Sequence, residues 1–262
     1  MKFKQSACIE TLYCEKPFLE RFSAAKADGF AGVEFWSWTD KDLSKVKEAA
    51  ENAEITICGF NGDAELSLID PDHNKNYLEF LKKSIAAAKQ VGALSLTIHS
   101  NGLGEAGKVL NHYEKLSDTV KTCNMFYMLE QCAALAESED ILLNLEGLNI
   151  ITDHVGNYLV NTSVAAEMCR IIGSDYLKVL YDVYHMQLNE GNLCNNIESF
   201  IDVIGHVHVA DCPGRHEPGT GEIYYPKIYK TLANTGYGGY IGYELFPETT
   251  TKKAVEAIMS IV

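Results

Sequence analysis

Val179-Leu180-Tyr181-Asp182 gives the clearest indication of how this chain folds, because a short apolar run there ends abruptly in a carboxylate. Continuous apolar runs rich in β-branched and aromatic residues are typical of parallel strands buried on both faces. Val207-His208-Val209 has the same character, and similar runs recur along the whole sequence. The eight strands predicted in this way cover residues 4–9, 31–36, 54–59, 93–98, 141–145, 177–181, 205–209 and 240–244.

Longer amphipathic stretches separate these strands and predict helices. Asp70-Pro71-Asp72 supplies turn and capping residues before one of them, and Gly92 follows it where a left-handed cap is favoured. Thr39-Asp40 and Asn161-Thr162 are candidate caps for two others. The predicted helices cover residues 17–28, 40–53, 73–91, 110–138, 162–173, 193–203, 226–235 and 250–261.

Eight strand–helix units without a linker predict one α/β domain over residues 1–262, a single (β/α)₈ TIM barrel. The length agrees, since such barrels typically have about 250 residues. A doubly wound open sheet is the alternative. That fold usually carries a glycine-rich phosphate loop after its first strand, and Glu10-Thr11-Leu12-Tyr13 contains no glycine.

The composition argues against some classes of partner. The formal charge is −14, and no dense Lys/Arg cluster is present for a nucleic-acid backbone. We find no long apolar run that predicts a secretory signal or a membrane span. The eight scattered cysteines lack a CxxC pair, so we expect reduced thiols in a cytoplasmic protein. The sequence leaves a homo-oligomer open.

Polar side chains end several of the predicted strands, and the carboxyl ends of barrel strands carry the active site of this fold. Glu146, Asp182 and Glu244 follow three strands, and His208 lies within a fourth. Each alone is more simply a helix cap, a solvated loop residue or a core histidine. Three carboxylates converging on one mouth repel strongly, however, and need a cation or protons. Oxygen ligands with one imidazole predict one divalent metal ion: Mn²⁺, Mg²⁺, Co²⁺ or Zn²⁺.

Four further residues lie at strand ends without an assigned chemical role. His99 ends the fourth strand, and we expect it to contact substrate or a metal ligand. Glu34 is a candidate for the same surroundings, or for hydrogen bonds between neighbouring strand ends. Trp36 and Trp38 could wall the pocket or pack beneath a loop.

Four blocks in the second half of the chain resemble the hydroxypyruvate isomerase family, within the xylose isomerase-like TIM barrels that also include ketose 3-epimerases and endonuclease IV. In the first half, the resemblance is mainly one of architecture. The blocks are NLEGLN at 144–149, LYDVYHMQ at 180–187, HVADCPGRHEPGTGEI at 208–223 and GYELFP at 242–247.

This resemblance implies that Glu146, Asp182, His208 and Glu244 bind the metal, and that Glu146 and Glu244 are the two acid–base groups on opposite faces of the substrate. Proton transfer next to a carbonyl needs a base at the C–H bond and an electrophile at the oxygen, which a metal supplies. We therefore expect an isomerase that passes through a metal-stabilised enediolate.

The resemblance also implies substrate contacts outside the metal quartet. His185 and Arg215 match positions that contact substrate oxygens. We add His99 and Glu217 as candidate substrate-binding residues, the latter because the loop 213–221 carries Gly214, Gly219 and Gly221 and is expected to close part of the site.

The substrate expected first is a small keto acid, hydroxypyruvate, converted to tartronate semialdehyde. Two residues depart from the family pattern: Gly147 replaces a usual proline, and Thr152 replaces a carboxylate that epimerases carry. His208 is shared with epimerases, where many hydroxypyruvate isomerases have Gln. A ketose 3-epimerase or a keto-tetronate isomerase remains the alternative. An endonuclease IV-like enzyme is more remote, because it needs a metal cluster and a basic surface, and a non-catalytic sugar-binding barrel has little use for two opposed carboxylates.

Overall fold

The computed structural model describes residues 3–261 and contains the predicted barrel. Eight strands, all paired in parallel, close on themselves in the order β1 to β8, with β8 returning to β1. The strands are β1 Lys4–Cys8, β2 Gly32–Phe35, β3 Thr56–Asn61, β4 Ser95–His99, β5 Leu142–Glu146, β6 Leu177–Asp182, β7 Ile204–Val209 and β8 Tyr240–Tyr243.

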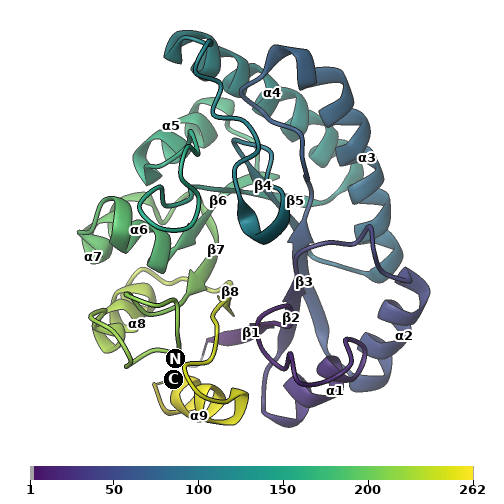
Figure 1. The fold of residues 1–262 in the computed structure, drawn as a ribbon, viewed down its shortest axis with the longest axis vertical. Coiled ribbons are helices and arrows are strands. Elements are labelled where there is room, and N and C mark those ends of the chain that lie inside the picture. The colour runs from purple at the N-terminus through teal and green to yellow at the C-terminus, as the bar shows by residue number, and fades with distance from the viewer. Residues whose placement is uncertain (1–2, 262) are drawn as a thin grey trace.

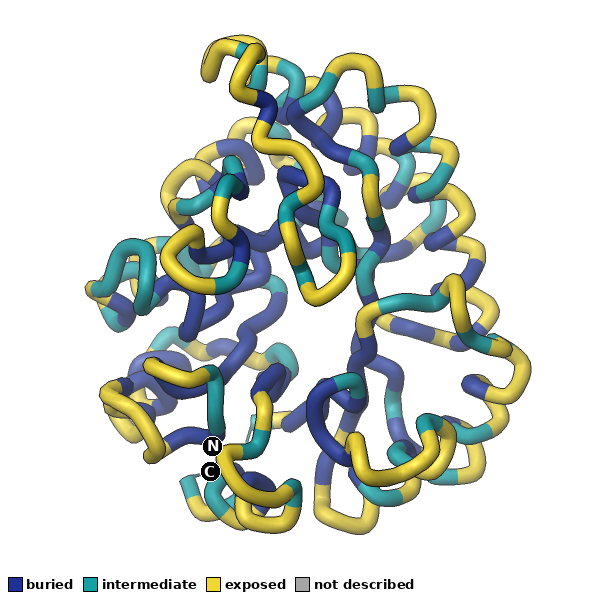
Figure 2. The backbone as a smooth tube through the Cα atoms, in the orientation of Figure 1, coloured by how far each residue is buried: buried dark blue, intermediate teal, exposed yellow. Residues whose placement is uncertain are grey.

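The helices form a ring outside the strands (Figure 1). They bury one face against the barrel and expose the other, so the inner turns are dark blue and the outer turns yellow in Figure 2. The α-helices are α1 Glu20–Ala27, α2 Leu43–Ala53, α3 Asn74–Val91, α4 Asp118–Glu139, α5 Thr162–Ile172, α6 Val183–Asn189, α7 Leu193–Phe200, α8 Tyr225–Asn234 and α9 Thr251–Ile261, and the 3₁₀ turns are η1 Pro71–His73 and η2 Glu105–Gly107.

Helix starts differ from the prediction where a different side chain caps the first turn. Asp42, not Thr39 or Asp40, accepts the Ser44 and Lys45 amides and begins α2. Ser117 caps α4, so the part of the predicted helix before Ser117 is loop.

Two more local differences involve β6 and α5. The short helix α6 directly after β6 was not expected. Asn161 makes no capping hydrogen bond at α5; the Glu190 carboxylate accepts from the Thr162 amide instead.

Strand register determines which side chains meet at the mouth of the barrel. In the β4–β5 pair, His99 lies opposite Glu146, and in the β6–β7 pair, Asp182 lies opposite His208. In the β7–β8 pair, His208 lies opposite Gly242. The segment between β4 and α4 projects toward the centre of the ring (Figure 1). In residues 3–261, no helix is long and apolar enough to cross a membrane.

Candidate metal centre and active-site cavity

Four strand-end side chains converge at the mouth of the barrel as the sequence predicted. One ligand atom each from Glu146, Asp182, His208 and Glu244 can be chosen so that all lie within 4.8 Å of one another. His208 Nδ1 lies 3.4 Å from Glu244 Oε2 and 3.9 Å from both Glu146 Oε1 and Asp182 Oδ2. All four residues are at most 9% exposed.

The free atoms of this quartet fit a divalent cation. Glu146 Oε1 and His208 Nδ1 are buried and have no hydrogen-bond partner among the described residues. Burial and the neighbouring Glu146 carboxylate raise the pKa of Asp182 to about 7, which is the expected response of crowded, desolvated carboxylates. A cation among these atoms would satisfy the unpaired atoms and offset the repulsion. Three oxygens and one imidazole nitrogen are suitable donors for Mg²⁺, Mn²⁺, Co²⁺ or Zn²⁺.

The two oxygens of Asp182 make different contacts: one caps a helix, and the other faces the quartet. Oδ1 accepts the Tyr184 and His185 amides, at 2.7 and 3.0 Å, and so caps α6. This cap orients the carboxylate and leaves Oδ2 facing His208. The α6 helix that the sequence did not predict is therefore part of what fixes one ligand.

Arg215 and Trp36 hold the Glu244 carboxylate from two sides. Arg215 donates to Oε2 at 2.7 Å and the Trp36 indole donates to Oε1 at 2.5 Å. Burial of Glu244 opposes its charge, but the Arg215 guanidinium and His208 outweigh that effect and hold the pKa of Glu244 well below its usual range. Glu244 is thus an ionised, oriented carboxylate.

His185 lies fully buried beside Arg215 as a neutral imidazole. Burial and the Arg215 charge hold the pKa of His185 well below its usual value. Its Nδ1 is 2.7 Å from the Asn149 amide nitrogen and its Nε2 is 3.4 Å from Arg215. Two of the four predicted substrate-binding residues, His185 and Arg215, therefore line the cavity together.

His99 links Glu146 to a carboxylate that the sequence analysis missed. Its Nε2 is 3.2 Å from Glu146 Oε2, and its Nδ1 is 3.0 Å from Asp63 Oδ1. Burial disfavours the charged ring, but Asp63 and Glu146 outweigh this and raise the pKa of His99 to about 10. Asp63 lies two residues beyond the end of β3. A search for polar residues that included the first few positions after each strand would therefore have identified it.

Glu34 contacts one member of the quartet, His208, and a second histidine of β7, His206. Its two oxygens lie 2.7 Å from His208 Nε2 and 3.2 Å from His206 Nε2. Hydrogen bonds between neighbouring strand ends were one expectation for Glu34, whereas both of its histidine partners lie on β7.

Most of these groups line one cavity of about 850 Å³ at the carboxyl ends of the strands, whereas Asp182 lies behind its wall. The wall residues among them are Glu34, Trp36, Asp63, His99, Glu146, His185, His208, Arg215 and Glu244. Lys108, Asp153 and His154 complete its wall from the loops after β4 and β5. His154 Nδ1 lies 2.7 Å from the Gly107 carbonyl oxygen, which ties these two loops together. The size lies within the range of small-molecule sites, about 300–1,000 Å³.

Two predicted residues lie elsewhere. Glu217 is absent from the cavity wall: it is 5% exposed, and its carboxylate accepts the Glu248 amide at 2.9 Å. The loop turns the Glu217 side chain away from the mouth. Its carboxylate binds the segment after β8 instead. Trp38 donates to Ser84 and packs on Phe80, beneath the loop.

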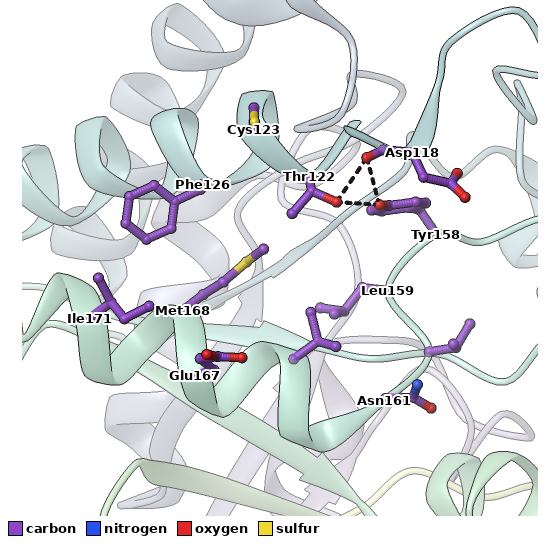
Figure 3. A pocket seen from close by; sticks show the side chains of 12 residues that line it. Asp118, Thr122, Cys123, Phe126, Tyr158, Leu159, Asn161, Glu167, Met168 and Ile171 are labelled. Atoms are coloured by element: carbon purple, nitrogen blue, oxygen red, sulfur yellow. Dashed lines mark hydrogen bonds between the residues drawn. The ribbon is translucent and has the colours of Figure 1, made fainter. Parts of the chain in front are cut away.

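A second cavity of about 710 Å³ lies outside the barrel, between α4 and α5 (Figure 3). Its wall is mainly apolar, with Phe126, Met168 and Ile171 along one side. Thr122 and Tyr158 are hydrogen bonded at its edge. Because its carboxylates are exposed and do not converge, we assign it no chemistry.

Comparison with known proteins identifies several relatives. A family model described as "Xylose isomerase-like TIM barrel" matches residues 22–261. Hydroxypyruvate isomerase of Escherichia coli K12 is 32% identical over 94% of this chain and 95% of that protein. The 2-oxo-tetronate isomerase of Cupriavidus necator is 28% identical over 94% of each chain. The crystal structure of AP endonuclease, family 2, from Brucella melitensis aligns with a TM-score of 0.89, covering 99% of both chains; at 24% identity it supports the fold alone.

Proposed function

Because this chain belongs to the hydroxypyruvate isomerase family within the xylose isomerase-like TIM barrels and is an isomerase of a sugar or keto acid, we propose that its reaction is the metal-dependent conversion of hydroxypyruvate to tartronate semialdehyde. The observation that carries this proposal is the pair Glu146 and Glu244. They come from the ends of β5 and β8, face one cavity, and share the same cluster of donor atoms.

The proposed reaction moves two protons within the substrate. A C3 proton of hydroxypyruvate is removed and a proton is delivered to C2, while the C3 hydroxyl proton passes to the C2 oxygen. One of the two glutamates acts as the base and the other as the acid, on opposite faces of the intermediate enediolate. A cation held by the quartet would act as a Lewis acid for the substrate carbonyl.

The surrounding side chains have roles that follow from their contacts. Arg215 and Trp36 keep Glu244 ionised and oriented, and His99 orients Glu146 from the other side. Negative charge develops on substrate oxygen as the proton leaves, so Arg215 and neutral His185 are placed to stabilise it.

One basic side chain of the cavity wall favours a keto acid over a neutral ketose. Lys108 lines the cavity and has no ion pair within 4.0 Å among residues 3–261. Lys108 is therefore available for a substrate carboxylate, whereas Arg215 already contacts Glu244.

The cavity volume favours a second candidate, a four-carbon 2-oxo-tetronate. Hydroxypyruvate has only three carbons, and 850 Å³ leaves space beyond it. The four-carbon acid adds one hydroxymethyl unit and uses the same carboxylates and the same proton transfer. The similarity to the 2-oxo-tetronate isomerase supports this candidate.

A substrate panel tests the proposal. The metal-loaded protein is assayed with hydroxypyruvate, a 2-oxo-tetronate and neutral ketoses in deuterated water, and the products are identified by NMR. We expect turnover of the keto acids with solvent deuterium at the new C–H bond. Epimerisation of a ketose without turnover of either keto acid would reject the proposal.

We also propose a cytoplasmic location. All eight cysteines lie within the described residues and all are unpaired. Free thiols, several of them buried, fit a reducing compartment.

A further inference from the structure

Glu34 reaches across the inside of the barrel to a residue of the metal quartet. It lies at the end of β2, whereas His208 lies on β7, and β1 and β8 separate these strands. Glu34 Oε2 is 2.7 Å from His208 Nε2, and both residues are 7% exposed. This is the shortest contact that either Glu34 oxygen makes to a histidine.

This contact determines which nitrogen of His208 is free. An ionised carboxylate can only accept a hydrogen bond, so the nitrogen next to Glu34 must carry a proton. The remaining nitrogen, Nδ1, is buried without a hydrogen-bond partner and faces Glu146, Asp182 and Glu244. With its proton released, Nδ1 presents its lone pair to the centre of the quartet.

Glu34 is itself held in one orientation. His206 Nε2 lies 3.2 Å from the second oxygen, Oε1, and the His206 and His208 rings meet edge to face, with centroids 5.0 Å apart. Gly242 makes room for the pair: a Cβ at that position would lie 2.7 Å from both Glu34 Oε1 and His208 Cδ2. The carboxylate therefore has little freedom to rotate away from His208.

We propose that Glu34 is a positioning residue that fixes the His208 ring and keeps its proton on Nε2, so that Nδ1 can bind the metal. The inference rests on the proposed metal-dependent function. Carboxylate partners of metal-bound histidines generally orient the ring and raise its basicity. Glu34, His206 and His208 could also hold a cation themselves, but a protonated Nε2 cannot be a metal ligand.

Metal affinity tests this role directly. Mn²⁺ is titrated by calorimetry into metal-free wild type, Glu34→Leu, Glu34→Gln and the control Glu190→Gln. We expect one Mn²⁺ per wild-type chain and affinity weaker by about 10- to 100-fold in Glu34→Leu. Glu34→Gln should lose less, since its amide oxygen can still accept from Nε2. Glu190 is a partly buried carboxylate that accepts three hydrogen bonds and is not part of the cavity wall, so its variant should bind as wild type does.

A second measurement separates positioning from general stability. In the Zn²⁺-loaded protein, ¹⁵N NMR of histidine should show His208 protonated at Nε2 in wild type and perturbed at that nitrogen in Glu34→Leu. If Glu34→Leu does not fold, Glu34→Asp tests the same contact, because the shorter side chain withdraws the carboxylate from His208 Nε2, and it should also weaken Mn²⁺ binding.

Three outcomes would overturn either the positioning role of Glu34 or the proposed metal-dependent function. Wild-type Mn²⁺ affinity in folded Glu34→Leu would overturn the positioning role and leave the proposed function standing. Two Mn²⁺ per wild-type chain, with one lost in Glu34→Leu, would make Glu34 a ligand and also overturn it. If wild type binds no divalent ion, the proposed function itself fails.

Discussion

The two halves of the barrel mouth both carry buried ionisable side chains, but they use them differently. On the β5–β8 half, Glu146 and His208 keep an unpaired atom facing the centre. On the β2–β4 half, Glu34 and Asp63 direct their oxygens to histidines. In our proposal, one half thus supplies the ligands and acid–base groups, and contacts from the other half orient His208 and Glu146. Both halves carry buried, charged side chains, so burial and charge do not distinguish them. The unpaired atoms of Glu146 and His208 do.

The largest effect should come from the two glutamates of the β5–β8 half. In Glu146→Gln and Glu244→Gln, the amide cannot take up or return a proton, so we expect kcat to fall by at least about 10³-fold, near the upper range for general acid–base groups. Initial rates with hydroxypyruvate measure this, and circular dichroism confirms that each variant is folded. A near-normal rate in either one would refute the two-carboxylate mechanism.

Removal of divalent metal tests the quartet on the same β5–β8 half. Exhaustive dialysis against a chelator should abolish turnover, and added Mn²⁺ should restore it, because the quartet then regains a cation for its crowded carboxylates. Full activity in a sample shown by elemental analysis to contain no metal would contradict the assignment.

On the β2–β4 half, Asp63→Asn should have an intermediate effect. It weakens the hold on His99, which contacts Glu146, so we expect kcat/KM to fall by about 10- to 100-fold, as for other outer partners of metal ligands. Mn²⁺ affinity should fall in parallel. If Asp63→Asn matched Glu146→Gln in severity, the division between the two halves would be wrong.

Trp36→Phe should be milder, because Arg215 still holds Glu244. A hydrogen bond to a charged group contributes about 1.5–3 kcal/mol, and part of that loss is recovered by water at this half-exposed position. We expect kcat to fall by about threefold to tenfold, with unchanged thermal unfolding. No change in kcat would show that the indole N–H is not needed to orient Glu244.

Lys108→Met should give the smallest effect and concerns substrate choice. Lys108 is exposed, so its attraction for a carboxylate is screened. We expect KM for keto acids to rise only a few-fold, with kcat unchanged. A neutral ketose tested as an inhibitor should bind equally well to both proteins; equal losses for charged and neutral compounds would contradict the carboxylate contact.

The four proposed ligands could be located from the sequence because each lies at or next to the end of an apolar strand, and such ends can be recognised in the sequence alone. The supporting half could not, because its contacts cross the barrel. Nothing near Glu34 in the sequence indicates that β2 and β7 side chains meet above Gly242. Glu217 was misplaced for a related reason: a glycine-rich loop predicts a turn but not the direction in which the turn points its side chains.

Closure of the barrel by β1 and β8 has a consequence for synthesis. Ala7 pairs with Tyr243, directly before Glu244, so the ring stays open until β8 has emerged from the ribosome. Asp182 and Glu146 emerge much earlier, yet a nascent chain holds only part of the donor set. The complete set of four candidate donor residues is therefore assembled only once β8 has joined β1.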